Sequence, residues 1–285
     1  MKRFALALLS LAAFGVLFLS SRPFTAIDPR TTPSLRHITS RLILTGSSTV
    51  APLATEIGKA FEKEHPGVRV DVQTGGSSRG IADARRGLAD IGMVSRPLNG
   101  DETDLFAFTI AGDGISMILH ADNPIAKLSR RDIIKIYTGQ VTNWKEFGGK
   151  DAPITVVNKA EGRSTLELFI SFLKISNQDI QADVVIGDNA QGIKTVAGNV
   201  NAVAYVSVGA AEYDAATGVP IKLLPIDGIE ASTKTVRQGT FPLARPLNLV
   251  TTTPPAGLAA TFIEFARSPG RIPLIEEQYF VPVTE

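Results

Sequence analysis

The sequence predicts an α/β fold built on parallel β-sheets, and two observations favour this class. From residue 41 onward, apolar segments of strand length alternate with segments whose apolar residues recur at helical spacing. Loops rich in glycine, serine and threonine separate these segments, and three such loops come directly before a predicted helix. A strand–helix–strand succession of this kind forms a parallel sheet through right-handed crossover connections.

The amino-terminal series follows this alternation closely. Leu53, Ala54 and Ile57 recur at helical spacing, and His65-Pro66-Gly67 ends that helix. The predicted elements are a strand at 42–44, a helix at 50–64, a strand at 68–73, a helix at 81–86 and a strand at 91–94.

A second series begins near Ser116 and repeats the same pattern. Its predicted elements are a helix at 129–138, a strand at 154–158, a helix at 165–173 and a strand at 203–206. The chain is expected to be extended between residues 236 and 250, where Pro242 and Pro246 exclude a helix, and it closes with an amphipathic helix at 256–267.

Composition excludes several classes of protein. Lysine and arginine number 29 against 28 aspartate and glutamate, so the chain lacks the basic excess of a nucleic-acid-binding protein. It has no cysteine, which rules out disulfides, thiolate nucleophiles, thiolate metal ligands and a lipid-anchored cysteine. The three histidines have no metal-ligand spacing, so no metal or cofactor is expected.

The amino terminus predicts that the chain is exported. Lys2 and Arg3 precede an apolar run, 4–19, which is shorter than the roughly 20 residues of a membrane span. We interpret residues 1–26 as a signal peptide and residues 27–40 as a disordered lead-in. Phe24 is too bulky for a clean cleavage site, so an uncleaved anchor stays an alternative.

The three glycine- and serine-rich loops predict an anion site. They are Gly46–Thr49, Gly75–Gly80 and Glu161–Thr165, each at the end of a strand and ahead of a helix. Helix amino termini present unpaired N–H groups and a partial positive charge, which bind anions. Serine and threonine are also the usual N-caps, so helix capping is the alternative for any single loop.

Four basic residues lie in or near these loops. Lys159 and Arg163 are the candidates for direct contact with an anion, and Arg79 is a weaker one. Arg96 follows a strand and is equally well explained as the partner of an acid in another part of the fold.

At these loops the sequence resembles the phosphate-binding proteins of high-affinity phosphate ABC importers. The resemblance extends from about Leu42 to the carboxyl terminus. The segments that carry it are Gly46–Leu53, Gly75–Gly80, Ala89–Leu98, Ile136–Trp144, Asn201–Ser207 and Phe241–Leu247.

The resemblance implies a type II periplasmic-binding-protein fold, in which each of two lobes is a mostly parallel sheet flanked by helices and two crossover strands form the hinge. It places residues 41–115 and 241–285 in lobe I and residues 116–240 in lobe II. A bound anion would bridge the lobes and stabilise their closed form. With the loop chemistry, the expected ligand-binding residues are Ser48, Thr49, Val50, Ser77, Ser78, Ser95, Lys159, Arg163, Ser164 and Thr165.

Two departures from the family pattern concern the ligand. Family members carry Arg-x-x-Gly-Ser-Gly-Thr where this chain has Lys159–Thr165, and arginine and lysine contact oxyanions differently. Well-known members place an aspartate after the 91–94 strand to accept the ligand's proton, whereas Ser95 stands here. Glu161 is an alternative acceptor, although pairing with Lys159 or Arg163 explains it equally.

The resemblance implies a monomeric binding protein, not an enzyme, that delivers inorganic phosphate or a similar oxyanion to an ABC permease of the inner membrane. One alternative is a sensor or adhesion protein that keeps the fold with a changed ligand. The other is a phosphomonoester hydrolase with an acid pair drawn from Asp90, Asp113, Glu161 and Asp188, which are better explained as caps, turns or ion pairs.

Overall fold

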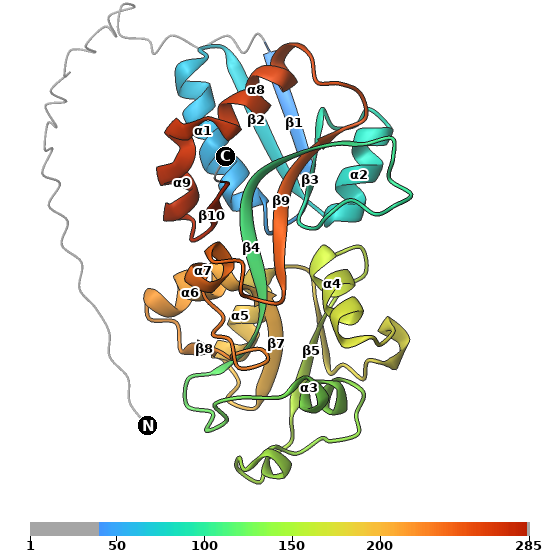
Figure 1. Ribbon diagram of the computed structural model, residues 1–285, viewed down its shortest axis with the longest axis vertical. Coiled ribbons are helices and arrows are strands. Elements are labelled where there is room, and N and C mark those ends of the chain that lie inside the picture. Colours follow the sequence, from blue (N-terminus) through green and yellow to red (C-terminus); the bar gives the residue numbers. More distant parts are fainter. Residues whose placement is uncertain (1–39, 284–285) are drawn as a thin grey trace, which may run out of the picture. The chain divides into compact units, whose positions relative to one another are not determined.

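Two lobes joined by two long strands make up the structure, a computed structural model that describes residues 40–283 (Figure 1). The joining strands are β4 (Phe106–His120) and β9 (Ala244–Thr251), which pair antiparallel with each other. The predicted signal peptide and lead-in lie outside the described residues, apart from Ser40. Within the described part of the chain, no helix has the length and apolar character needed to cross a membrane.

The first lobe combines the amino-terminal series with the carboxyl-terminal helices. Its elements are β1 (Ser40–Gly46), α1 (Ala51–Glu64), β2 (Val68–Thr74), α2 (Ser77–Arg85), β3 (Ile91–Val94), α8 (Gly257–Arg267), the 3-10 turn η3 (Pro269–Arg271), α9 (Ile272–Glu277) and β10 (Val281–Pro282).

The second lobe consists of the middle of the chain. Its elements are α3 (Arg130–Tyr137), η1 (Trp144–Phe147), β5 (Thr155–Lys159), α4 (Ser164–Leu173), η2 (Asn177–Asp179), β6 (Val184–Ile186), α5 (Asn189–Ala197), β7 (Ala202–Ser207), α6 (Val208–Ala216), β8 (Ile221–Leu223) and α7 (Thr233–Arg237).

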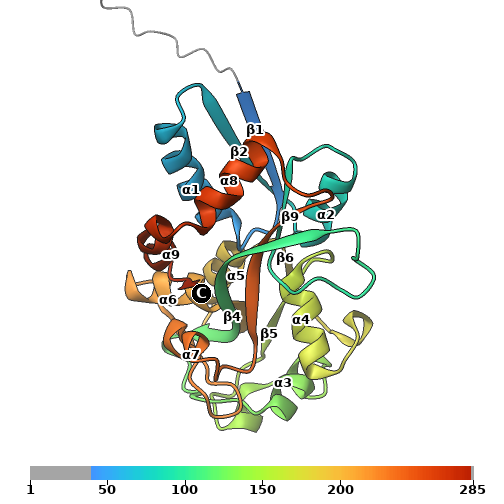
Figure 2. The same ribbon diagram turned by 45° about the horizontal axis from the view of Figure 1, so that its top comes forward.

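The described strands form one continuous sheet in the order β2-β1-β3-β9-β4-β7-β5-β6, with β8 and β10 paired to β4. In the first lobe β1 is parallel to β2 and β3, and in the second β5 is parallel to β6 and β7. Strand β4 pairs with β9 as far as Gly114 and with β7 from Ile115, so it passes from one lobe to the other (Figure 2).

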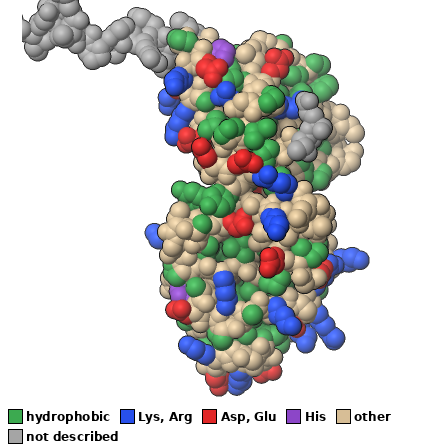
Figure 3. Space-filling model, turned by 60° about the vertical axis from the view of Figure 1, so that its left-hand side comes forward, with side chains coloured by type: hydrophobic (Ala, Val, Ile, Leu, Met, Phe, Trp, Pro, Cys, Tyr) green, Lys and Arg blue, Asp and Glu red, His purple; other side chains and the backbone are tan. Residues whose placement is uncertain are grey.

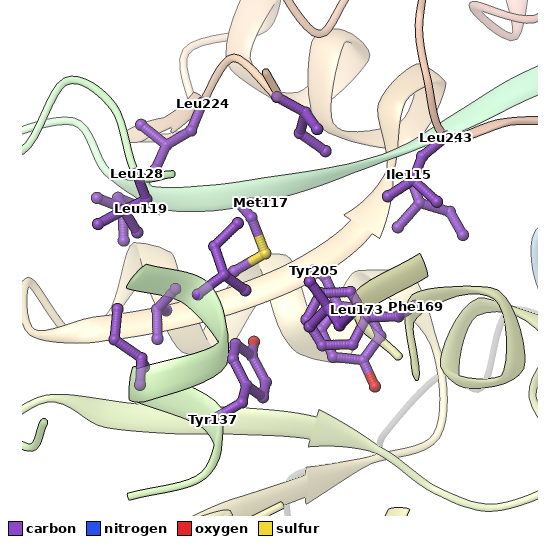
Figure 4. Packing of buried hydrophobic residues seen from close by; sticks show 14 of the residues in the cluster. Ile115, Met117, Leu119, Leu128, Tyr137, Phe169, Leu173, Tyr205, Leu224 and Leu243 are labelled. Atoms are coloured by element: carbon purple, nitrogen blue, oxygen red, sulfur yellow. The ribbon is translucent and has the colours of Figure 1, made fainter. Parts of the chain in front are cut away.

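Each lobe has its own hydrophobic core. In the first lobe, Phe61 of α1 and Phe262 of α8 are fully buried and pack edge to face, with ring centroids 5.2 Å apart. In the second lobe, Phe169 stacks on Tyr205 with centroids 3.7 Å apart, and Tyr137 packs beside both (Figure 4). Burial of such a side chain contributes roughly 1.5–3 kcal/mol, so each lobe holds its loops on a rigid base.

Most predicted elements are present, but helix α2 begins four residues earlier than the prediction. It starts at Ser77 because Gly76, with φ of 98°, turns the chain directly into the helix. The second glycine-rich segment is therefore largely the first turn of α2 and not a loop. Residues 236 and 237, expected to be extended, instead end the short helix α7, which has a Ser232 capping box.

Candidate functional site

A small pocket between the lobes is lined almost entirely by hydroxyl side chains. Its nine lining residues comprise one glycine, one arginine and seven serines or threonines: Ser47, Ser48, Thr49, Gly76, Ser77, Ser95, Arg163, Ser164 and Thr165. They follow β1, β2, β3 and β5, four strands in the two lobes. These are the carboxyl ends of parallel strands, where ligands of open α/β sheets bind.

Three helices begin at this pocket, and none has its amino terminus capped by a side chain. The N-cap residues of α1, α2 and α4 are Val50, Gly76 and Arg163. Of the helices that begin elsewhere, α3, α5, α6 and α7 have a side-chain cap, whereas α8 and α9 have none. Helix capping still accounts for part of the pocket's chemistry, because Ser47 Oγ accepts from Thr49 N at 3.2 Å and from Val50 N at 3.4 Å ahead of α1, and Ser78 N of α2 donates to Gly162 O. The other first-turn N–H groups of these helices are available to a ligand.

Unpaired polar atoms inside the pocket also indicate that it binds a ligand. Four buried side-chain polar atoms lack a hydrogen-bond partner within residues 40–283, and two of them, Arg163 Nε and Ser164 Oγ, belong to the pocket. Leaving a buried polar group unpaired costs about 1–3 kcal/mol. Two such groups in one pocket favour a bound acceptor, and the guanidinium favours an anionic one.

Arg245, on hinge strand β9, is a residue that the sequence reasoning missed. Its side chain is fully buried and donates to both lobes: Nη1 lies 2.9 Å from Thr165 Oγ1 and Nη2 lies 3.3 Å from Thr49 Oγ1. Nη1 is also 3.4 Å from Ser95 Oγ. Arg245 thus places a fixed positive charge next to three of the predicted ligand residues.

Asp113, on hinge strand β4, holds this guanidinium in place. Its Oδ2 accepts from Arg245 Nε and Nη2 at 3.1 and 2.8 Å, and its Oδ1 accepts from Ser207 Oγ at 3.0 Å. The ion-pair explanation of Asp113 is confirmed. A buried charge needs such a partner, because an unpaired one would be strongly destabilising.

Lys159 lies behind the pocket and not in its wall. Its Nζ donates to Asn189 Oδ1 at 2.9 Å, and Asn189 Nδ2 in turn donates to Thr49 Oγ1 at 3.2 Å. Burial, with the nearby charge of Arg245, lowers the pKa of Lys159 to about 7. Near neutral pH this ammonium is therefore only partly charged.

Direct hydrogen bonds connect the two lobes beside the pocket. Ser78 N donates to Gly162 O at 3.3 Å and Ser78 Oγ donates to Glu167 Oε1 at 3.1 Å. The other oxygen of Glu167 accepts from Arg96 Nε at 2.7 Å, while Glu102 forms a bidentate pair with the remaining Arg96 nitrogens. The interpretation of Arg96 as the partner of an acid is confirmed, with Glu102 in its own lobe and Glu167 in the other.

The structure brings seven of the predicted ligand residues together in the pocket and places three outside its wall. Those outside are Val50, which is buried in the first core, Ser78, which is exposed and bonded to Glu167, and Lys159. Glu161 bonds to Asn177 Nδ2 at 3.1 Å, and neither of the basic partners expected for it is found.

Two residues of the site that were not among the predicted ligand residues have a recognisable sequence pattern. Asp113 and Arg245 are the single charges inside the strand segments Phe106–Leu119 and Leu243–Thr251. A lone charge in a buried strand needs an opposite partner, so each of these charges indicates a buried ion pair but does not identify the residue at its other end. Asn189 left no such trace, because an amide at a helix start is common. Residues 40–283 contain no cluster of three or more acidic or histidine side chains that could hold a metal ion.

Comparison with known proteins gives a consistent result. Residues 31–269 match the family model described as a PBP superfamily domain. The phosphate-binding protein PstS of Bacillus subtilis is 28% identical over 250 residues, which covers 86% of this chain and 81% of that protein. Among solved structures, one similar protein is a phosphate ABC transporter substrate-binding protein from Clostridium perfringens with bound phosphate. It has a TM-score of 0.78 and is 30% identical, and the match covers 86% of this chain and 100% of that chain. An ABC-type phosphate transport receptor from Vibrio cholerae has a TM-score of 0.67 and 28% identity, over 85% of this chain and 100% of its own.

Proposed function

Because the chain belongs to the PBP superfamily, we propose that it captures inorganic phosphate in the hydroxyl-lined pocket and delivers it to an ABC permease. The observation that carries this proposal is the convergence of three uncapped helix amino termini on two unpaired buried donors, Arg163 Nε and Ser164 Oγ. The relatives are named for binding and transport, and the chain is a binding protein and not an enzyme.

The charges around the pocket suit an oxyanion that accepts many hydrogen bonds. Arg163 lines the pocket, Arg245 lies behind its hydroxyls, and Lys159 reaches it through Asn189. Each hydrogen bond between a dry neutral donor and a charged ligand contributes about 1.5–3 kcal/mol. The donors come from both lobes, so an anion that satisfies them holds the lobes together and stabilises the closed form.

Ser95 has a defined part in this arrangement. Its oxygen accepts from Ser47 Oγ at 2.9 Å and from Arg245 Nη1 at 3.4 Å. With both lone pairs engaged, the hydroxyl has only its proton to offer a ligand. Ser95 is therefore a donor, and it does not take over the proton-accepting part of the aspartate that other family members carry.

We place the boundaries of the lobes after residues 115 and 240, which gives lobe I residues 41–115 and 241–285 and lobe II residues 116–240. The change of partner of β4 at Gly114 and Ile115 supports the first boundary. We further propose that the chain acts in the periplasm as a monomer, directed there by the basic and apolar amino-terminal segment.

Isothermal titration calorimetry of the compact unit His37–Glu285, stripped of ligand by unfolding and refolding, tests the proposal. Phosphate is expected to bind at one site, and Arg163→Gln is expected to weaken binding about tenfold or more, because one hydrogen bond to the anion is lost. Arg79→Gln is the matched control, since Arg79 is 53% exposed and pairs with Asp83.

Sulfate, arsenate and molybdate complete the titration panel. Tighter binding of sulfate or molybdate than of phosphate would assign a different oxyanion to the same pocket. If none of the four anions binds, the transport proposal fails and the sensor or adhesion alternative takes its place.

A further inference from the structure

A second, larger cavity adjoins the hydroxyl-lined pocket on the side of the molecule formed by α1, α5, α6 and the segment around α9. Its volume is about 560 Å³, within the range of small-molecule sites. Ser48 and Thr49 line both the cavity and the pocket, so the two spaces share one wall. Figure 3 shows this face of the molecule, notched where the lobes meet.

The charge of this cavity is opposite to that of the pocket. Its lining includes two carboxylates, Asp188 and Asp214, and no lysine or arginine. Asp188 caps helix α5 through the N–H of Gln191 at 2.8 Å, which leaves its second oxygen available. Asp214 has no ion pair or side-chain hydrogen bond within the described part of the chain, and burial raises its pKa.

The cavity is present although the lobes are already in contact beside it. Asn189 of the second lobe donates to Thr49 of the first, and Arg245 bridges Thr49 and Thr165. The space is therefore not simply the gap of a fully open cleft. Part of the cavity wall is apolar and is formed by Val72, Ile193 and Phe280. Such a wall can contact the hydrocarbon part of a ligand.

An acidic cavity is unsuited to a free oxyanion, because two carboxylates oppose the approach of an anion. It suits a molecule whose anionic end occupies the hydroxyl-lined pocket and whose cationic end reaches the carboxylates. We propose that this chain also binds phosphate monoesters of short amino alcohols, with the phosphate in the pocket and the primary ammonium beside Asp188 and Asp214. This inference rests on the proposed function, since it uses the same phosphate pocket.

Calorimetry on His37–Glu285 with matched probe pairs tests the inference. The probes are 2-aminoethyl phosphate against ethyl phosphate, and 4-aminobutyl phosphate against butyl phosphate, with inorganic phosphate as reference. We expect the better amino ester to bind about tenfold more tightly than its alkyl counterpart, the effect of one hydrogen bond between charged groups.

Two variants locate the effect. Asp214→Asn keeps the shape of the side chain and is expected to remove the preference for the amine while leaving the affinity for inorganic phosphate unchanged. Ala190→Trp fills the cavity from the exposed first turn of α5 and is expected to exclude all four esters but not inorganic phosphate. Asp122→Asn, at an exposed turn away from the cavity, is the control.

The outcomes separate the inference from the proposed function. Binding of inorganic phosphate without any ester, or equal binding of amino and alkyl esters, overturns the inference and leaves phosphate capture intact. A preference for the amino esters that persists in Asp214→Asn also overturns the inference, because the ammonium would then not be recognised by the carboxylates of the cavity. Failure of inorganic phosphate and esters alike removes the proposed function, and this inference with it.

Discussion

At the scale of single residues, the surroundings of Lys159 disfavour the charged form of its side chain. Lys159 is 3% exposed, its ammonium donates to the amide oxygen of Asn189, and the positive charges of Arg245 and Arg163 oppose its own. Together these effects lower its pKa from 10.5 to about 7. A bound anion would reverse the effect, so binding above pH 7 should take up a proton.

The pH dependence of unfolding tests this shift. Below pH 7 Lys159 is charged in both states, and its burial costs stability. Between pH 7 and 10.5 the folded chain has released a proton that the unfolded chain keeps, so stability rises with pH. In urea unfolding of the ligand-free protein, the free energy of unfolding of the wild type should rise by about 2 kcal/mol relative to that of Lys159→Met from pH 7 to pH 9.

The same comparison with Lys127→Met supplies the control, because Lys127 is exposed. If the free energies of unfolding of wild type and Lys159→Met differ by a constant amount across this pH range, Lys159 stays charged in the folded state. The expectation of proton uptake on binding would then be withdrawn as well.

Residue by residue, the hydroxyls of the site were predictable and its central charge pair was not. Six of the pocket residues could be found because each follows a strand next to glycine or another small residue, and Ser95 was found through the family resemblance; the six are Ser48, Thr49, Ser77, Arg163, Ser164 and Thr165. Arg245 and Asp113 face each other across β4 and β9, 132 residues apart in sequence. No local pattern reveals that pairing, which depends on the register of two hinge strands.

At the scale of elements, helices α2 and α4 meet through their first turns. Gly76 makes this possible, because a Cβ atom there would lie 2.4 Å from Gly162 O. Ser78 of α2 and Arg96 after β3 then reach the two oxygens of Glu167 on α4. The contact connects the lobes on one side of the pocket.

Glu167→Ala tests whether this contact favours the closed form. Phosphate that binds the closed form should bind about fivefold more weakly, because a partly exposed ion pair across the lobes contributes about 1 kcal/mol. Arg96 keeps its bidentate pair with Glu102, so the fold should tolerate the change.

Glu264→Ala, on the exposed face of α8, provides the comparison in the same calorimetric titration. An unchanged dissociation constant for Glu167→Ala would mean that the contact between α2 and α4 is incidental to closure. A comparable weakening in Glu264→Ala would point to a general loss of stability instead.

At the scale of the whole molecule, the alternation of strands and helices was enough to predict the parallel strand pairing within each lobe. Strands β1, β2, β3, β5 and β7 and helices α1, α3, α4 and α8 have the expected type and lie within a few residues of the expected bounds. These are the elements whose apolar residues recur with a regular period.

The long hinge strand β4 was not predicted as such. It contains Gly112, Asp113 and Gly114 at its centre, which interrupt the strand pattern. The segment is extended because it pairs with β9 on one side of this interruption and with β7 on the other. Tertiary pairing therefore overrides a weak local preference, and the continuous sheet could not be read from the sequence.

A crystal structure of His37–Glu285 grown with phosphate would test the central claim most directly. The account predicts one phosphate in the hydroxyl-lined pocket, with hydrogen bonds from Arg163 Nε, Ser164 Oγ and the first-turn N–H groups of α2 and α4 other than that of Ser78, which is bonded to Gly162 O. An empty pocket at saturating phosphate, or a phosphate held elsewhere on the protein, would contradict it.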